Sequence, residues 1–485
     1  MISGITVDFA AIRGAMAEFQ LSPKVEPNEV IELDRAFFPD GHRGVLDLKR
    51  QLVIGNRGMG KSFWTHSLVN SELRERLAQV YELPVLAKAD VVIGFNGSEK
   101  IGPVAPTIEE ISRALKDRTP PELIWRAVML RATHTLRSTS EPLSLNGTIS
   151  KLKSHPHAYA QELSAADDIL VQEKRSLLVV FDALDRLAED WSGIRELTKG
   201  LLIRALGLQS FRAIRMKIFM RVDQFADAEL FRFPDSSKIR NDHVNLSWRP
   251  HELYGLLFFE LFRNPLARES LERLAESTPM RLMLIEGGPS SSARMDEQAA
   301  LVSFLAGEFM GNHKKRGRVY SWVPLHLSDA ANNCSPRTFL TAWKSAAEHI
   351  PPPRGLAVDH LGLIDGVRHA SSTRLTELRE DYPWIDIALE PLRRQFVPIS
   401  REDLFGLWAK NKVVPKILES SQKNRWLAPI GVGVLDEKNP LALLQAMSII
   451  AVMEQRANGK INVPDIFRVE AEILRKGGVA VPRRA

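Results

Sequence analysis

Apolar runs of strand length alternate with helix-forming stretches in the first half of the chain. Helical patterns occupy residues 62–77, 107–117 and 122–136, and another is expected near Trp191 and Leu201. Strands that alternate with helices in this way predict parallel βαβ units in a doubly wound sheet. The runs expected to form the buried strands cover residues 45–54, 90–95, 176–182 and 216–222.

Strand-like runs become rare after residue 246. Residues 250–350 and 372–450 are instead rich in helical patterns. Near the end, residues 440–454 place apolar side chains at helical spacing, which predicts an amphipathic helix. The Asn458-Gly459 pair that follows lies between short strand-like segments and predicts a hairpin turn.

Two segments interrupt these patterns. Residues 141–165 are rich in Ser, His and Pro, which favours an irregular insertion. Residues 350–355 contain consecutive prolines, which stiffen a linker and predict a domain boundary. The expected fold class is an α/β core with a parallel sheet and flanking helices, followed by a mostly helical C-terminal region.

Composition favours a globular protein of a reducing compartment. Of the 485 residues, 44% are hydrophobic and 26% are charged, so disorder is not expected. The single cysteine, Cys334, excludes a disulfide framework, and neither a signal peptide nor a membrane-length apolar run is found. We therefore expect a soluble, cytoplasmic protein without a membrane partner. The net charge of +6 permits a DNA partner without arguing for one.

The residues after the first apolar run read GNRGMGKS and match the phosphate-binding P-loop pattern. The glycines let the backbone turn and direct N–H groups at phosphate oxygens, and the next helix points its positive end at them. Lys61 supplies a positive charge between the outer phosphates, and the Ser62 hydroxyl can coordinate Mg²⁺. The residues expected to bind the nucleotide, ATP with Mg²⁺, are Gly55, Asn56, Arg57, Gly58, Met59, Gly60, Lys61, Ser62 and Phe63.

The run Leu177–Phe181 ends in Asp182. An apolar strand that ends in an acid is what a Walker B segment requires, because the buried strand fixes the carboxylate where it can orient the Mg²⁺ shell. We therefore expect Ser62 and Asp182 to be the metal residues of the site.

Asp185 lies three residues after Asp182 and is the candidate for activating the attacking water. Many ATPases place Glu directly after the Walker B Asp, and here that position is Ala183. The alternative is that Asp185 caps the next helix, in which case hydrolysis is expected to be slow.

Arg221 follows the last predicted core strand, whose end should reach the γ-phosphate. It is the candidate sensor of that phosphate, with Asp223 beside it. The alternative is an arginine that faces the surface.

These residues together resemble the STAND and AAA+ ATPases, including the origin-recognition-like branch. The likeness is strongest to a set of bacterial P-loop ATPases with further motifs that run from about residue 45 almost to the end of the chain. The matching motifs in this chain are Leu246-Ser247-Trp248, Ser335-Pro336-Arg337-Thr338-Phe339, Arg374 to Trp384 and Gly459 to Arg468.

The resemblance implies a helical lid after the core and a sensor arginine at the start of a lid helix. Arg337 matches that position, with Ser335 as helix cap and Pro336 in the first turn. The alternative is an ordinary arginine at a helix start. The resemblance also suggests Arg186 as a finger for the nucleotide of a neighbouring subunit.

The C-terminal region resembles a winged-helix domain, with a wing around Asn458-Gly459. Such a module can bind DNA or dock a protein, and the tail carries basic residues. The implied domains are a lead-in (1–45), the P-loop core (46–245), a helical lid (246–350) and a helical region with a winged-helix-like end (351–485). The basic tail residues are Arg475, Lys476, Arg483 and Arg484.

The leading hypothesis is an ATP-binding, ATP-hydrolysing switch whose nucleotide state controls oligomerisation or engagement of a separate effector protein. A role in bacterial defence follows from family analogy alone. Two alternatives remain open: a DNA-binding regulator or loader that uses ATP as a structural ligand, and a scaffold for an effector.

Overall fold

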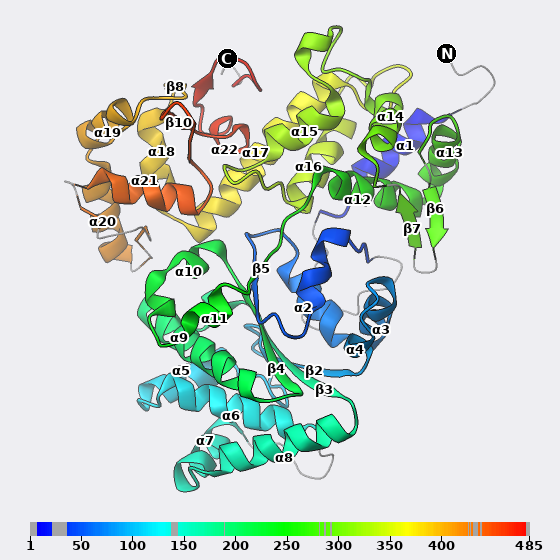
Figure 1. The fold of residues 1–485 in the computed structure, drawn as a ribbon. Helices are drawn as coiled ribbons and strands as arrows, with labels where there is room; N and C mark the ends of the chain where they lie inside the picture. Colours follow the sequence, from blue (N-terminus) through cyan, green and yellow to red (C-terminus); the bar gives the residue numbers. More distant parts are fainter. Residues whose placement is uncertain are drawn as a thin grey trace. The chain divides into compact units, whose positions relative to one another are not determined.

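The chain forms two compact units, one of residues 24–246 and one of residues 1–23 with 247–485. Figure 1 shows both in a computed structural model. The described residues are 7–21, 36–136, 144–188, 190–280, 282–285, 288–291, 293–424, 426, 428–429, 435–436 and 439–481. Within them, no helix combines the length and the apolar character needed to cross a membrane.

The unit of residues 24–246 is built on a five-stranded parallel sheet, with strand order β2-β3-β4-β1-β5. The predicted parallel sheet is thus confirmed. The edge strand β5 was not predicted, because it is only two residues long. The strands are β1 (Leu52–Ile54), β2 (Ala89–Phe95), β3 (Ser176–Phe181), β4 (Ile214–Met220) and β5 (Val244–Asn245).

The strand order explains where a site can form. The chain crosses from β1 to the far edge at β2 and then returns through β3 and β4, so its helices cover both faces of the sheet (Figure 1). Strand β4 lies between β1 and β3, which brings the carboxyl ends of these three strands side by side. In open parallel sheets, ligands bind at such a reversal of strand order.

Helices surround this sheet at most of the predicted positions. The expected strand at 45–54 is shorter than predicted, because residues 40–46 form a 3₁₀ helix instead. The expected helix at 62–77 is two helices, since Asn70 leaves the helical conformation and its side chain caps the second. The helices of this unit are η2 (Asp40–Leu46), α2 (Lys61–Val69), α3 (Ser71–Val80), α4 (Pro84–Ala87), α5 (Ile108–Lys116), α6 (Pro121–His134), α7 (Leu145–Ser154), α8 (Ala158–Gln172), η3 (Leu184–Arg186), α9 (Trp191–Gly207), η4 (Leu208–Ser210), α10 (Val222–Ala226), η5 (Ala228–Phe231) and α11 (Ser236–Arg240).

The prediction of an irregular insertion at 141–165 was wrong. Residues 141–143 lie outside the described residues, and from residue 144 onward this segment forms α7 and the first half of α8. Ser144 caps α7, and Leu145, Ile149 and Leu152 recur at helical spacing and are buried. The Ser, His and Pro content concealed this periodicity, and Pro156 falls between the two helices.

A buried lysine joins strand β4 to the segment before β1. The Lys217 side chain is fully buried, and its ammonium donates hydrogen bonds to the carbonyl oxygens of Asp47 at 2.6 Å and Arg50 at 2.7 Å. Burial lowers the pKa of Lys217 to about 7, although the charge of Asp47 opposes the shift. The unfolded chain therefore binds more protons than the folded chain between pH about 7 and the ordinary lysine value of 10.5.

We expect the free energy of unfolding to rise with pH across this window, because the charged form is disfavoured in the fold. Between pH 7 and 9 the wild type should gain about 2 kcal/mol relative to Lys217→Met, since one pKa unit corresponds to about 1.4 kcal/mol. Urea unfolding at several pH values measures the difference, with exposed Lys88→Met as control. Parallel pH profiles for wild type and Lys217→Met would contradict the assignment.

The unit of residues 1–23 and 247–485 is mostly helical, as predicted. Its N-terminal helix α1 packs on α13 and α16, so part of the lead-in belongs to this unit. The helices are α1 (Phe9–Ala17), α12 (Pro250–Arg263), α13 (Pro265–Glu276), α14 (Met295–Ala306), η6 (Lys314–Arg316), α15 (Val319–Leu327), α16 (Pro336–Ala347), α17 (His360–Asp381), α18 (Ile385–Leu389), η7 (Glu390–Leu392), α19 (Arg401–Lys410), α20 (Val413–Asn424), α21 (Pro440–Ile449) and α22 (Asp465–Arg468).

Helices α16 and α17 pack closely enough to require glycine. A Cβ atom on Gly366 would lie 2.2 Å from the carbonyl oxygen of Ala342, well inside contact distance. Gly362 approaches the Ala346 carbonyl in the same way, one turn earlier on α17 and one turn later on α16. The two helices therefore meet backbone to backbone.

Short strand pairs occur in this unit, and the predicted hairpin around Asn458-Gly459 is confirmed as the antiparallel pair β9–β10. Ile399 also bridges to Ile461 on β10, which extends the pair by a third segment. The β6–β7 hairpin was not predicted. The strands are β6 (Leu282–Ile285), β7 (Gly288–Ser291), β8 (Phe396–Val397), β9 (Glu454–Gln455), β10 (Ile461–Asn462) and β11 (Leu474–Arg475).

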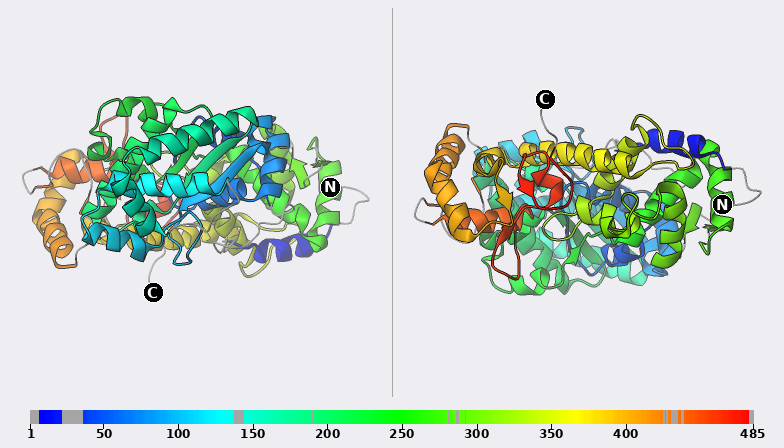
Figure 2. Two further views of the ribbon diagram at one scale, coloured as in Figure 1. Left: turned by 90° about the horizontal axis from the view of Figure 1, so that it is seen from below. Right: turned by 90° about the horizontal axis from the view of Figure 1, so that it is seen from above.

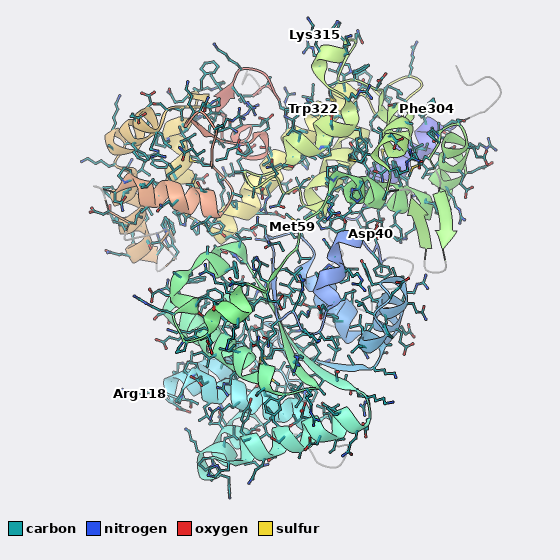
Figure 3. All side chains as sticks on the ribbon, in the orientation of Figure 1. Asp40, Met59, Arg118, Phe304, Lys315 and Trp322 are labelled. Carbon is teal, nitrogen blue, oxygen red and sulfur yellow. The ribbon has the colours of Figure 1, made fainter. Side chains whose placement is uncertain are left out.

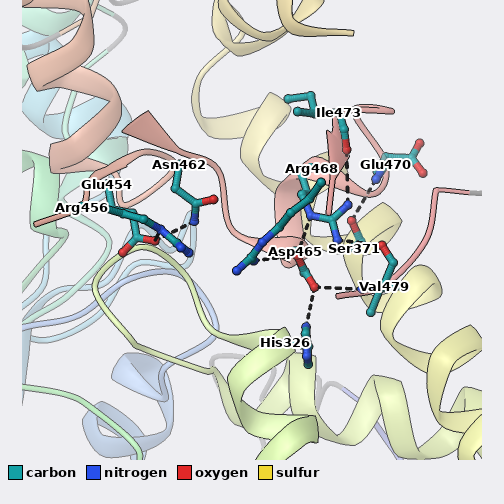
Figure 4. Close-up of polar contacts among 11 residues, drawn as sticks. His326, Ser371, Glu454, Arg456, Asn462, Asp465, Arg468, Glu470, Ile473 and Val479 are labelled. Atoms are coloured by element: carbon teal, nitrogen blue, oxygen red, sulfur yellow. Dashed lines mark hydrogen bonds and ion pairs between the residues drawn. The ribbon is translucent and has the colours of Figure 1, made fainter. Parts of the chain in front are cut away.

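A buried carboxylate holds the segment from Asp465 to Val479 in place. Asp465, at the start of α22, accepts hydrogen bonds from Arg468 at 2.5 Å, from the Val479 backbone at 3.2 Å and from the His326 ring on α15 (Figure 4). Arg475 also pairs with it at 3.3 Å, and α22 packs on α17 (Figure 2). Asp465 and Arg468 each leave only 1% of their side chains exposed.

Candidate nucleotide-binding site

The predicted P-loop connects the carboxyl end of β1 to the first residue of α2. Gly58 and Gly60 adopt positive φ angles of 82° and 102°, where side chains are disfavoured. Gly55 has a different requirement, because a Cβ there would lie 3.1 Å from the Cβ of Leu246. The loop therefore has the turned backbone that directs N–H groups at phosphate oxygens.

Lys61 begins α2 and folds its ammonium back over the loop. The Nζ donates to the carbonyl oxygens of Gly55 at 2.8 Å and Asn56 at 3.1 Å. Part of the residue remains exposed, yet burial of the ammonium lowers the pKa of Lys61; the charge of Asp182 opposes this shift and that of Arg221 adds to it. A phosphate beside the ammonium would favour its charged form, so the residue suits an anionic ligand.

Ser62 and Asp182 meet, as the sequence predicted for a metal pair. The Ser62 hydroxyl donates to Asp182 Oδ2 at 3.0 Å, and the Thr65 hydroxyl lies 3.4 Å from the same oxygen. Hydroxyl and carboxylate oxygens are the donors that Mg²⁺ prefers, so this pair fits the expected ion. Thr65 was not predicted, although its spacing of three residues from Ser62 places both on one helix face.

The backbone after Asp182 helps to orient its carboxylate. Ala183 takes the left-handed conformation with φ 54°, which is uncommon for a residue with a side chain. Its N–H then donates to Asp182 Oδ1 at 2.8 Å. One carboxylate oxygen is therefore held by the turn, while the other faces Ser62.

Asp185 lies exposed in η3, beyond this turn. Its charge is among those that act on Lys61. The alternative role as cap of the following helix is wrong, because Asp190 caps α9 by accepting from the Gly193 N–H at 2.8 Å. Asp185 thus remains the candidate for water activation, and Arg186 lies exposed beside it.

Arg221 follows β4, at the strand end that lies between the P-loop strand and Asp182. Its guanidinium forms two hydrogen bonds with Asp223, at 3.0 and 3.2 Å. Only 16% of the Arg221 side chain is exposed, so the alternative of a surface-facing arginine is not supported. The positive charge of Arg221 also lowers the pKa of Lys61, so the two cations lie within electrostatic reach of each other.

Arg337 belongs to the other unit, in the first turn of α16. Ser335 caps this helix by accepting from the Thr338 N–H at 3.1 Å, and Pro336 is its first residue, as predicted. The Arg337 guanidinium donates to Glu377 at 2.8 Å. Its role as a sensor of the nucleotide stays a prediction.

Aromatic side chains anchor α2 behind the loop. The Trp64 indole donates to His42 Nδ1 at 3.0 Å, which ties the helix to η2. Phe63 packs edge to face against Trp64 at 5.3 Å, and Met59 is buried beneath the loop. Asn56 and Arg57 are half-buried on the loop itself.

Comparison with known proteins finds similar folds at low similarity. A Walker-type ATPase of Pyrococcus abyssi aligns over 93% of this chain and 97% of its own, with 13% identity and a TM-score of 0.37. The ORC2 protein of Aeropyrum pernix, solved in ADPNP–ADP complexes, aligns over 94% of each chain with 13% identity and a TM-score of 0.37. The ORC1 protein of the same organism, solved with DNA, covers 95% of this chain and 94% of its own, with 14% identity and a TM-score of 0.32.

No protein-family model and no curated protein matches the sequence. At TM-scores this low the structural likenesses carry no functional argument. The assignment of the site therefore depends on the loop, the strand ends and the side chains of this chain.

Proposed function

We propose that this protein binds ATP with Mg²⁺ at the loop around Lys61 and hydrolyses it. The observation that carries the proposal is the 3.0 Å contact between Ser62 and Asp182, formed where a turned glycine loop enters a helix. Residues 120 positions apart in the sequence meet there in the arrangement that phosphate and Mg²⁺ require.

Each residue of the site has a role that its position supports. The N–H groups of the loop and the start of α2 would bind phosphate oxygens, and Lys61 would neutralise their charge. Ser62 and Asp182 would hold Mg²⁺, which when bound neutralises charge on the transferring phosphate. Arg221, at the end of the intervening strand, would approach the outermost phosphate by exchanging part of its pairing with Asp223.

In this proposal Asp185 activates the attacking water. Asp185 is exposed and therefore accessible to water, and Asp190 rather than Asp185 caps α9. A carboxylate in this position can accept a proton from the attacking water or orient it.

We expect Asp185→Asn to lower ATP turnover about 100-fold while ATP affinity changes little, because general-base catalysis contributes about that much. Steady-state phosphate release and calorimetric binding measure the two quantities. Asp168→Asn, an exposed acid of α8, is the control. Normal turnover by Asp185→Asn would transfer the role to another residue.

The output we propose for the nucleotide cycle is a switch in oligomerisation or in engagement of a separate effector. A ligand shifts such an equilibrium only through different contacts in the two states. Arg221 and Arg337 are the proposed sensors, because exchange of a carboxylate partner for a phosphate would supply that difference. Light scattering with and without a non-hydrolysable ATP analogue tests the switch, and the bacterial-defence role rests on analogy alone.

A second candidate is a DNA-binding regulator that uses ATP as a structural ligand. The observation that favours it is the β9–β10 hairpin after α21, which is placed like a wing. Of the basic tail, Arg475 is partly engaged by Asp465, and Arg483 and Arg484 lie outside the described residues. A winged-helix role is part of this proposal.

A further inference from the structure

The connection between α14 and α15 forms an ordered hairpin. Phe309 and Arg318 pair as an antiparallel bridge, and the Met310 N–H donates to the Gly317 carbonyl at 2.9 Å. Its tip is the 3₁₀ turn η6, closed by the Arg316 N–H to the His313 carbonyl at 2.9 Å. The backbone therefore holds the tip residues in a defined turn.

This tip carries a dense positive charge. Lys314, Lys315, Arg316 and Arg318 are all exposed, and His313 lies beside them. Glu308 pairs with Arg318 at 3.4 Å, but among the residues that the structure describes the other three cations make no ion pair. Because the whole chain has a net charge of only +6, four cations on one turn are a local concentration.

Aromatic side chains lie at the base of the same hairpin. Trp322, on the first turn of α15, is so close to Gly317 that a Cβ there would lie 3.3 Å from its ring (Figure 3). Arg318 lies over the Phe309 ring at 5.9 Å. Both rings are partly exposed, so flat apolar surfaces adjoin the basic turn.

We propose that this turn, residues 313–318, binds the phosphodiester backbone of a nucleic acid. Exposed lysine and arginine side chains on a narrow turn match a dense row of phosphates, which a duplex presents at one charge per roughly 1.7 Å of its axis. A lipid surface fits less well, because no residue from 313 to 318 has an apolar side chain, and the rings of Phe309 and Trp322 lie at the base of the hairpin, where they are only partly exposed.

The proposal is independent of the proposed ATPase activity and of the C-terminal hairpin. The turn belongs to the unit without the P-loop, and neither Asn458-Gly459 nor the basic tail is part of it. Phosphate contacts carry no sequence information, so the structure assigns affinity to this turn and no sequence preference.

The test compares the full chain with the triple variant Lys314→Glu, Lys315→Glu, Arg316→Glu. Fluorescence anisotropy with labelled duplex DNA, single-stranded DNA and RNA should show at least a 10-fold loss of affinity for one or more of them. The slope of log affinity against log salt should shrink by about 2–3, since each phosphate contact contributes about 0.9 on a duplex. Lys100→Glu, Lys116→Glu, Arg118→Glu makes the same charge change in the other unit and should lose far less (Figure 3).

The neutral variant Lys314→Gln, Lys315→Gln, Arg316→Gln guards against a folding defect and should give a similar loss of slope. An unchanged slope in the acidic tip variant, or an equal loss in the control variant, overturns the proposal. Loss of binding to phosphatidylserine vesicles without any change towards the three nucleic acids overturns it as well, in favour of a membrane surface.

Discussion

Replacing Lys61 with alanine is expected to lower ATP affinity at least about 100-fold. The ammonium would make charge-assisted contacts to two phosphates, and each such contact contributes about 1.5–3 kcal/mol. A loss of about 3 kcal/mol corresponds to roughly two decades in Kd. Isothermal titration with ATP and with GTP, in the presence of Mg²⁺, measures the effect and settles the base preference.

The same variant should fold normally, which separates binding from stability. The ammonium is buried against two carbonyl oxygens, so its removal loses two hydrogen bonds and also relieves a desolvation cost. We therefore expect the Tm without nucleotide to stay close to that of the wild type, while the rise of Tm with ATP disappears.

Exposed Lys49→Ala serves as the control, and it should keep the full ATP-dependent rise. Wild-type protein without affinity for ATP or GTP, or Lys61→Ala that binds within about threefold of the wild type, would falsify the phosphate site. That result would leave the Ser62–Asp182 contact as a structural hydrogen bond.

The phosphate-binding loop was predictable because the residues that would bind phosphate are consecutive in the sequence. The glycine loop, Lys61 and Ser62 form one short motif, and Asp182 follows an apolar run long enough to identify as a strand. Their meeting depends on the order of strands in the sheet. No periodicity reports that order, so the position of β4 between its neighbours came from the structure alone.

Other features could not be predicted for different physical reasons. The helices α7 and α8 were missed because the Ser, His and Pro content of residues 141–165 was given more weight than the few apolar residues at helical spacing. The β8–β11 pair was missed because each of its strands is two residues long, which is below the length at which alternation can be recognised. The contact between His326 and Asp465 joins residues 139 positions apart, and only tertiary packing creates it.

Asp465→Asn is expected to destabilise the helical unit by about 3–5 kcal/mol. The substitution keeps the shape of the side chain but leaves the Arg468 guanidinium buried without its carboxylate, and breaking a buried pair costs about that amount. Denaturant unfolding followed by tryptophan fluorescence measures the loss. The Val479 amide, which donates to Asp465, should also lose its protection from hydrogen exchange.

The pH dependence gives this prediction a second readout. Burial alone would raise the pKa of Asp465, but the hydrogen bond from His326 and the charge of Arg468 outweigh it and hold that pKa well below its usual range. The stabilisation is therefore complete above the ordinary aspartate value of 3.8 and is lost as the pH falls below it. The advantage of wild type over Asp465→Asn should shrink in that acidic range.

An exposed pair in the same unit provides the matched control. Arg379 and Asp386 lie 2.9 Å apart with 37% and 56% of their side chains exposed, so Asp386→Asn should cost less than about 1 kcal/mol. Adding Arg468→Met to Asp465→Asn should recover part of the loss, because the unpaired charge is then removed. Equal costs for Asp465→Asn and Asp386→Asn would show that burial adds nothing to the contribution of the Asp465 pair.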